Sequence, residues 1–151
     1  MPQSLSVVYL HLVFSTKERR PFLRDPIIRG EMHAWLGSAS GQLKCPSVLV
    51  GGVEDHVHIL ARHGRTISQA DWVKELKRTS SIWIKERDPR AHDFAWQAGY
   101  GVFSASASNL ESVRDYVARQ EEHHHKLSFQ DEFRMFLKKH GETWDERYVW
   151  D

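Results

Sequence analysis

The chain has 151 residues, of which 40% are hydrophobic and 27% are charged, and its formal net charge is +1. This composition predicts a single globular domain over residues 1–151 and excludes disordered and fibrous proteins. Cys45 is the one cysteine, which excludes an internal disulfide and a cysteine-built zinc site. No apolar run is long enough to span a bilayer, and basic residues follow the first apolar run instead of preceding it as in a secretory signal. We therefore expect a cytoplasmic protein without a membrane partner.

The hydrophobic pattern predicts strands and helices in alternation. Aromatic and β-branched residues predict strands over 6–14 and 99–105, and residues 48–61 predict two strands joined near Gly51-Gly52 or one bulged strand. Apolar spacing and capping residues predict helices over 27–43, over 68–87, from Ser108 or Asn109 to the histidine run, and over 129–140. This order predicts an α+β sandwich of the ferredoxin-like or RRM-like kind, with a mainly antiparallel sheet and helices covering one face.

His56 and His58 form a pair with one hydrophobic residue between them. Side chains at positions i and i+2 of a strand lie on the same face, with Cα atoms about 6.5–7 Å apart. Two imidazoles at this spacing can bind one cation, and Asp55 is placed to orient one of them. The pattern is short, and the pair by itself fits structural histidines as well as metal ligands.

Tyr116 and Gln120 lie four positions apart in the helix that precedes the histidine run. Residues at this spacing are neighbours on one helix face. Leu110, Val113 and Val117 follow helical spacing and are predicted to face the core, which puts Tyr116 at the edge of the apolar stripe. On its own, this position equally suits a tyrosine that bonds to solvent.

Basic residues gather on a loop and on a helix. The loop after the first strand carries Lys17, Arg19, Arg20 and Arg24, and the second helix carries Lys74, Lys77, Arg78 and Lys85. The helix spacing is typical of a solvated face, but the two groups together could neutralise a phosphate backbone. The predicted DNA contacts are Lys17, Arg19, Arg20, Lys74, Lys77 and Arg78.

The run His123 to His125 is a weak candidate for a metal site. Successive positions of a helix point about 100° apart, so three consecutive histidines cannot bind one ion from a regular helix. His124 alone lies on the Tyr116 face, one turn after Gln120. We expect it to support the ligands at most, and we expect the run to be mostly solvated.

Together these features resemble the single-tyrosine transposases of small bacterial insertion sequences, in the HUH endonuclease superfamily, and their relatives at repeated extragenic palindromes. The resemblance covers almost the whole chain, through the segments YLHLVFSTKERRPFL, GGVEDHVHILA, NLESVRDYVARQ and KKHGETWDERYVWD. It implies that His56 and His58 bind Mg²⁺ or Mn²⁺ with Gln120 as third ligand, and that Tyr116 is the nucleophile. The family cleaves and rejoins single-stranded DNA near hairpins through a 5′-phosphotyrosine link. Its members are commonly dimers that share a sheet and exchange the tyrosine helix, so a homodimer is expected.

The implied chemistry is physically consistent. A tyrosine phenol has a pKa near 10 and needs a metal to stabilise charge on the phosphate under attack. Nitrogen and oxygen ligands suit Mn²⁺ better than Mg²⁺. The covalent ester conserves the energy of the broken bond, so no nucleotide cofactor is needed, and the chain has no GxxxxGK[ST] phosphate loop.

Two other functions remain open at this point. One is a non-catalytic module that binds hairpin DNA and descends from such a transposase. The other is a metal-dependent hydrolase that uses water in place of Tyr116, which ranks lower because no carboxylate is clearly placed as a general base.

Overall fold

The structure is a computed structural model that describes residues 2–151. Its centre is one antiparallel sheet with the strand order β2-β3-β1-β4. The strands are β1 (Tyr9–Ser15), β2 (Ser47–Gly52), β3 (His56–Arg62) and β4 (Gly101–Ala105). The predicted pair of strands near Gly51-Gly52 is confirmed, because β2 and β3 form a hairpin that turns over residues 53–55.

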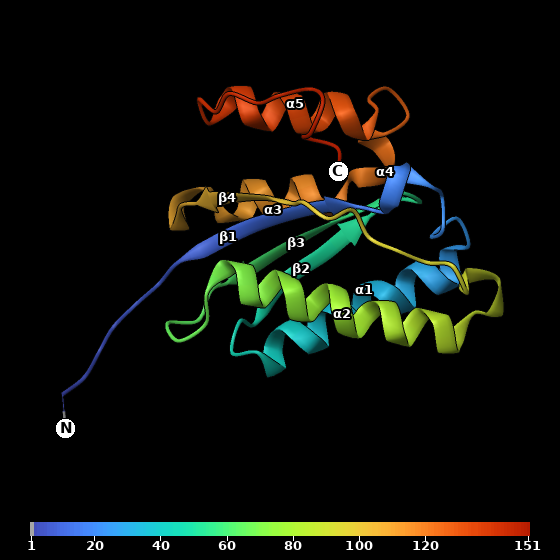
Figure 1. Cartoon of the computed structure of the whole chain (residues 1–151). Coiled ribbons are helices and arrows are strands. Elements are labelled where there is room, and N and C mark those ends of the chain that lie inside the picture. The colour runs from blue at the N-terminus through green and yellow to red at the C-terminus, as the bar shows by residue number, and fades with distance from the viewer. Residues whose placement is uncertain (1) are drawn as a thin grey trace.

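Helices lie on both faces of this sheet (Figure 1). The first face carries α1 (Pro26–Gln42) and α2 (Gln69–Arg87), and the second carries α3 (Leu110–Ala118), α4 (Gln120–His123) and α5 (Phe129–Lys139). Short 3₁₀ turns form η1 (Lys17–Arg19), η2 (Pro89–Ala91) and η3 (Ala107–Asn109). The α+β fold with an antiparallel sheet is therefore confirmed, with α1 and α2 covering one face as expected. The helices on the second face are an addition to that prediction.

Local sequence explains where the two long helices begin. Pro26 occupies the first turn of α1, where its missing N–H costs nothing, and the Asp25 carboxylate accepts from the Ile27 N–H at 2.9 Å. Ser68 caps α2 by accepting from the Asp71 N–H at 3.0 Å, as the sequence predicts. Neither helix is long and apolar enough to cross a membrane, and the same holds for the other helices within residues 2–151.

Alternation along the strands separates two apolar clusters. Leu12, Phe14, Val57 and Ile59 point to the first face and pack against apolar side chains of α1 and α2. The intervening residues point to the second face, where Val13 and the β4 residue Phe103 meet three phenylalanines of α5. These are Phe129, Phe133 and Phe136. Burial of each phenylalanine contributes roughly 1.5–3 kcal/mol, which holds α5 over this face.

A candidate metal and tyrosine site

The two histidines of β3 lie on the second face, under α5. His56 and His58 are fully buried, and each has one ring nitrogen held by a neighbour. His56 Nδ1 is 2.7 Å from the carboxylate of Asp55, and His58 Nδ1 is 2.7 Å from Nε2 of His11. These bonds fix the ring orientations and turn both Nε2 atoms toward the same point. The predicted convergence of the two imidazoles is present.

The tyrosine helix reaches the same point but is not continuous. Non-helical backbone at Arg119 (φ −104°, ψ 28°) separates α3 from α4, so Tyr116 lies on one helix and Gln120 begins the next. Gln120 Oε1 is 3.1 Å from Nε2 of His56. The Tyr116 ring stacks on His123, with centroids 4.3 Å apart. The structure thus brings together all four residues predicted for the metal and nucleophile site.

His124 has a more direct place than the sequence predicts. Its Nε2 points into the site, 3.1 Å from Gln120 Oε1, and its side chain is 10% exposed. The prediction placed His124 one turn after Gln120, and the His124 N–H indeed donates to the Gln120 carbonyl at 3.0 Å. Only His125 is exposed, whereas His123 and His124 are half-buried, so the expectation of a mostly solvated run is wrong.

Glu132 of α5 occupies the middle of the site, and the sequence analysis did not identify it. Its Oε1 lies 3.2 Å, 3.0 Å and 3.2 Å from Nε2 of His56, His58 and His124. Its Oε2 accepts a hydrogen bond from the Tyr116 hydroxyl. One signal could have revealed it, because Glu132 is an acidic residue on the apolar stripe of a helix that is otherwise lined by phenylalanine.

The spacing of these donor atoms suits a divalent cation. An octahedral ion with bonds of about 2.1 Å places neighbouring ligands about 3 Å apart. The nitrogens of His56 and His124 each lie 3.1–3.2 Å from both Gln120 Oε1 and Glu132 Oε1. One imidazole N–H can donate a well-directed hydrogen bond to only one of these two oxygens. The equal distances to both oxygens therefore fit a cation shared by the nitrogens and the oxygens better than they fit hydrogen bonds alone. His56, His58, His124 and Glu132 form a buried cluster that could bind a metal.

The electrostatics of the cluster follow from its burial and its carboxylates. Although burial lowers it, the pKa of His56 is raised to about 9 by hydrogen bonds to Asp55 and Glu132. Burial lowers the pKa of His58 to about 4 in spite of Glu132. Burial and the adjacent Glu132 carboxylate raise the pKa of the Tyr116 phenol. Burial acts to raise the pKa of Glu132, but bonds from His124, His56 and His58 lower it, so this residue is a carboxylate.

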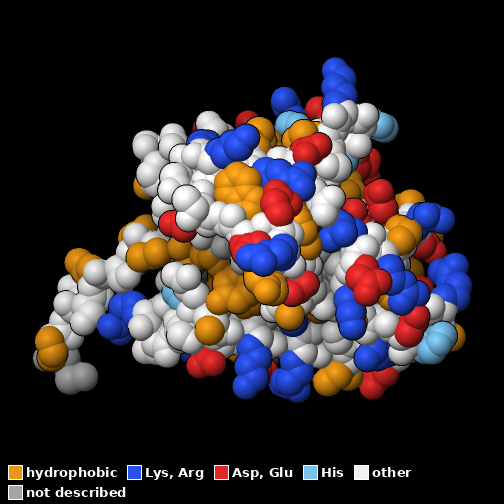
Figure 2. All heavy atoms as spheres, turned by 45° about the horizontal axis from the view of Figure 1, so that its top comes forward, with side chains coloured by type: hydrophobic (Ala, Val, Ile, Leu, Met, Phe, Trp, Pro, Cys, Tyr) orange, Lys and Arg blue, Asp and Glu red, His pale blue; other side chains and the backbone are white. Residues whose placement is uncertain are grey.

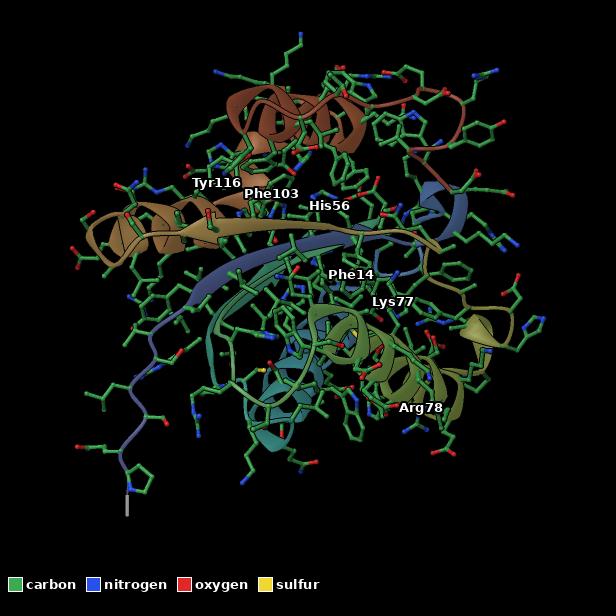
Figure 3. All side chains as sticks on the ribbon, turned by 60° about the vertical axis from the view of Figure 1, so that its left-hand side comes forward. Phe14, His56, Lys77, Arg78, Phe103 and Tyr116 are labelled. Atoms are coloured by element: carbon green, nitrogen blue, oxygen red, sulfur yellow. The ribbon has the colours of Figure 1, made fainter. Side chains whose placement is uncertain are left out.

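The basic residues predicted to bind DNA fall into two separate places. Lys77 and Arg78 lie across the sheet from His56 and Tyr116 (Figure 3). The Lys77 ammonium donates to the carbonyl oxygens of Gln97 and Gly99, both at 2.7 Å, and Arg78 is paired with Glu75 at 2.7 Å. Lys74 is exposed on the same helix. The contacts of Lys77 and Arg78 give both residues a structural role within α2 and its neighbours.

The basic loop lies close to the site. The Thr16 N–H donates to the carbonyl of Asp55 at 2.8 Å, which places η1 beside the residue before His56. Lys17 is exposed, Arg19 lies 5.9 Å over the Trp150 ring, and Arg20 is paired with Asp93 at 2.8 Å. Acidic and basic side chains are intermixed on the face shown in Figure 2.

A pocket of about 430 Å³ opens beside Tyr116, between α3, β4 and α5. Aromatic, basic and small polar side chains share its lining, including Phe103, Phe136, Lys139 and His140. His56 and His58 are closed to solvent, whereas Tyr116 lines this pocket.

Comparison with known proteins shows which family the chain belongs to. The profile of the family described as Transposase IS200 like matches residues 4–120. The chain belongs to this family. The match to the IS200-like transposases includes His56, His58, Tyr116 and Gln120, and it ends before His124 and Glu132.

Solved structures of two other proteins show the same fold. A protein of Deinococcus radiodurans R1, provisionally described as a transposase, is 22% identical over 80% of this chain and 95% of that chain, with a TM-score of 0.64. A REP-associated tyrosine transposase bound to a REP hairpin is 10% identical over 82% of this chain and 72% of that chain, with a TM-score of 0.59. No curated protein matches the chain.

Proposed function

We propose that this IS200-like transposase cleaves and rejoins single-stranded DNA near hairpin ends, with Tyr116 as nucleophile. The observation that carries the proposal is the meeting of Tyr116 and Gln120 with His56 and His58, from segments about 60 residues apart in the chain. The hairpin held by the REP-associated transposase of similar fold supports hairpin DNA as the ligand. The pocket beside Tyr116 is the proposed approach for the unpaired strand.

Each residue then has a chemical task. His56, His58 and Gln120 would hold a divalent cation, which when bound supplies Lewis-acid stabilisation of charge on the scissile phosphate. Three imidazoles in one cluster favour Mn²⁺ over Mg²⁺, because Mg²⁺ prefers oxygen ligands and water. The Tyr116 oxygen replaces the 3′ oxygen on phosphorus, and the freed 3′ hydroxyl can later attack the phosphotyrosine ester to rejoin strands.

The same contacts also bear on the two alternative functions. The raised pKa of Tyr116 weakens the phenol as a nucleophile at neutral pH, and the histidines of β3 are closed to solvent. Both observations fit a non-catalytic hairpin-binding protein. Glu132 also provides a carboxylate that a water-using hydrolase would need.

A covalent-adduct assay separates these functions. The protein is incubated with Mn²⁺ and single-stranded DNA that carries the sequences flanking its gene, and the products are run on a denaturing gel. We expect a protein–DNA adduct that is absent with Tyr116→Phe. Hairpin binding without an adduct would identify the non-catalytic module, and cleavage by Tyr116→Phe at the unmutated rate would identify water as the nucleophile.

The homodimer stays a prediction. Within the single chain, Gln120 contacts His56 and Tyr116 contacts Glu132. Sedimentation at tens of micromolar protein tests whether two copies associate.

A further inference from the structure

Glu132 contacts both the histidine cluster and the Tyr116 hydroxyl. Its Oε1 faces the Nε2 atoms of His56, His58 and His124, at 3.0–3.2 Å. Its Oε2 faces the Tyr116 hydroxyl and lies 3.3 Å from the Gln120 Nε2. The two oxygens of one carboxylate therefore point to two different partners, the ligand cluster and the nucleophile.

The fold holds this carboxylate in place from both sides. Glu132 lies on α5, and its neighbours on the buried side of that helix, Phe129, Phe133 and Phe136, are packed against the sheet. The side chain of Glu132 is 0% exposed. A buried carboxylate is costly unless charge or hydrogen bonds compensate it, so its position calls for a specific role.

We propose that Glu132 is a positioning residue that links the metal to Tyr116. The inference rests on the proposed function and deepens it. Oε1 would serve as a ligand that adds a negative charge to a donor set of neutral imidazoles and an amide. Oε2 would hold the Tyr116 hydroxyl beside the ion. Because both tasks belong to one rigid carboxylate on α5, metal binding and nucleophile position depend on each other.

This role explains the composition of the cluster. Two histidines and Gln120 lie within the family match at residues 4–120, whereas His124 and Glu132 follow it. The segment after the matched region thus contributes charge and geometry to a site whose first ligands lie on β3. A carboxylate oxygen also suits Mn²⁺, which accepts mixed nitrogen and oxygen ligands.

Glu132→Gln tests the proposal, because glutamine has nearly the same shape and loses only the charge and one acceptor. Asp131→Asn is the matched control, since it removes the same charge from the adjacent, exposed position of α5. Mn²⁺ affinity is measured by the electron paramagnetic resonance signal of the free ion, after circular dichroism has confirmed that each variant is folded. We expect Glu132→Gln to bind Mn²⁺ about 10- to 100-fold more weakly and Asp131→Asn to bind it like the unmutated protein.

A second measurement reports on Tyr116 directly. In protein labelled with ¹³C-tyrosine, bound Mn²⁺ should broaden the ring signal of Tyr116, assigned by its loss in Tyr116→Phe. At Mn²⁺ concentrations that saturate each protein, Glu132→Gln should reduce this broadening because the hydroxyl is no longer held beside the ion. Equal Mn²⁺ affinity in Glu132→Gln and the unmutated protein, or broadening that the substitution leaves unchanged, would overturn the proposal. Failure of the adduct assay alongside the expected Mn²⁺ results would overturn the proposed strand transfer and leave the role of Glu132 in metal binding intact.

Discussion

Gly51 lies where α3 passes closest to the sheet. A Cβ added to Gly51 would overlap the carbonyl oxygen of Val117, the residue directly after Tyr116. Gly51→Ala must therefore push α3 away from β2, at a cost of about 1–3 kcal/mol. We expect lower stability in urea unfolding together with weaker Mn²⁺ binding, because Gln120 follows the end of α3 by two residues and would be displaced with it.

Gly30 provides the control for this change. It lies in α1, and a Cβ there would meet nothing within 4 Å. Gly30→Ala should stabilise the protein by about 0.5–1 kcal/mol, since alanine loses less backbone entropy in a helix. If both substitutions lower stability equally, close approach is not the cause at Gly51.

Asp55 tests whether ring orientation matters at the cluster. Its carboxylate holds Nδ1 of His56 at 2.7 Å, and its side chain is 22% exposed. Asp55→Ala should weaken Mn²⁺ binding by about 10- to 100-fold, because the His56 ring loses the bond that aims its Nε2. Glu54→Ala, at the exposed neighbouring position, should leave the titration of Mn²⁺ unchanged.

The local part of the site could be predicted from sequence, and the distant part could not. Strand alternation is a short-range rule, so His56 and His58 are predicted on one face, and four-residue spacing likewise pairs Tyr116 with Gln120. Glu132 lies 74 positions after His58, and its place depends on how α5 docks through its phenylalanines. Sequence periodicity shows that α5 has an apolar face but not which surface that face covers.

At the scale of elements, the C-terminal segment is fastened to α5 through Glu146. Its carboxylate accepts from Arg134 Nε at 2.7 Å and from the indole N–H groups of Trp144 and Trp150 at 2.9 Å and 3.0 Å. The Arg134 guanidinium also lies 5.0 Å over the Trp150 ring. These contacts hold the end of the chain along the helix that carries Glu132.

The contacts of Glu146 with Arg134, Trp144 and Trp150 should weaken at acidic pH. Hydrogen bonds from Arg134 and then from the two indoles lower the pKa of Glu146 to about 2. A carboxyl group whose folded pKa is depressed stabilises above its unfolded pKa, near 4.5, and that contribution is lost as the pH falls toward 2. We expect the indole N–H signals of Trp144 and Trp150 to stay constant in NMR spectra from pH 7 to about 4.5 and to shift below it.

Glu146→Gln is the control for that titration. The glutamine amide keeps an acceptor oxygen but does not ionise. In this variant the indole signals of Trp144 and Trp150 should therefore not shift between pH 4.5 and 2 while the protein stays folded. A transition centred at 4.5 in the unmutated protein would show that Glu146 is not held as described.

At the scale of the whole molecule, the two basic regions lie in different places, since α2 covers one face of the sheet and the loop follows the end of β1. Sequence alone cannot separate them, because both are groups of Lys and Arg with helical or loop spacing. In the fold, Thr16, the residue before η1, is bonded to Asp55 beside the site, whereas α2 covers the other face of the sheet. Within the described chain, Lys77 and Arg78 already contact carbonyl and carboxylate oxygens. A hairpin with its unpaired strand at Tyr116 is therefore expected to contact the loop more than the helix.

Lys17→Gln and Lys74→Gln test this asymmetry with one exposed lysine from each region. Each phosphate contact contributes about 0.9 to the slope of log affinity against log salt concentration. Lys17→Gln should lower that slope by about one and weaken hairpin binding, whereas Lys74→Gln should change both less. Fluorescence anisotropy of a labelled hairpin with a single-stranded flank, measured over a range of salt concentrations, gives both quantities. Equal losses in the two variants would mean that the DNA contacts both faces, and a larger loss in Lys74→Gln would place the hairpin on α2, away from the tyrosine.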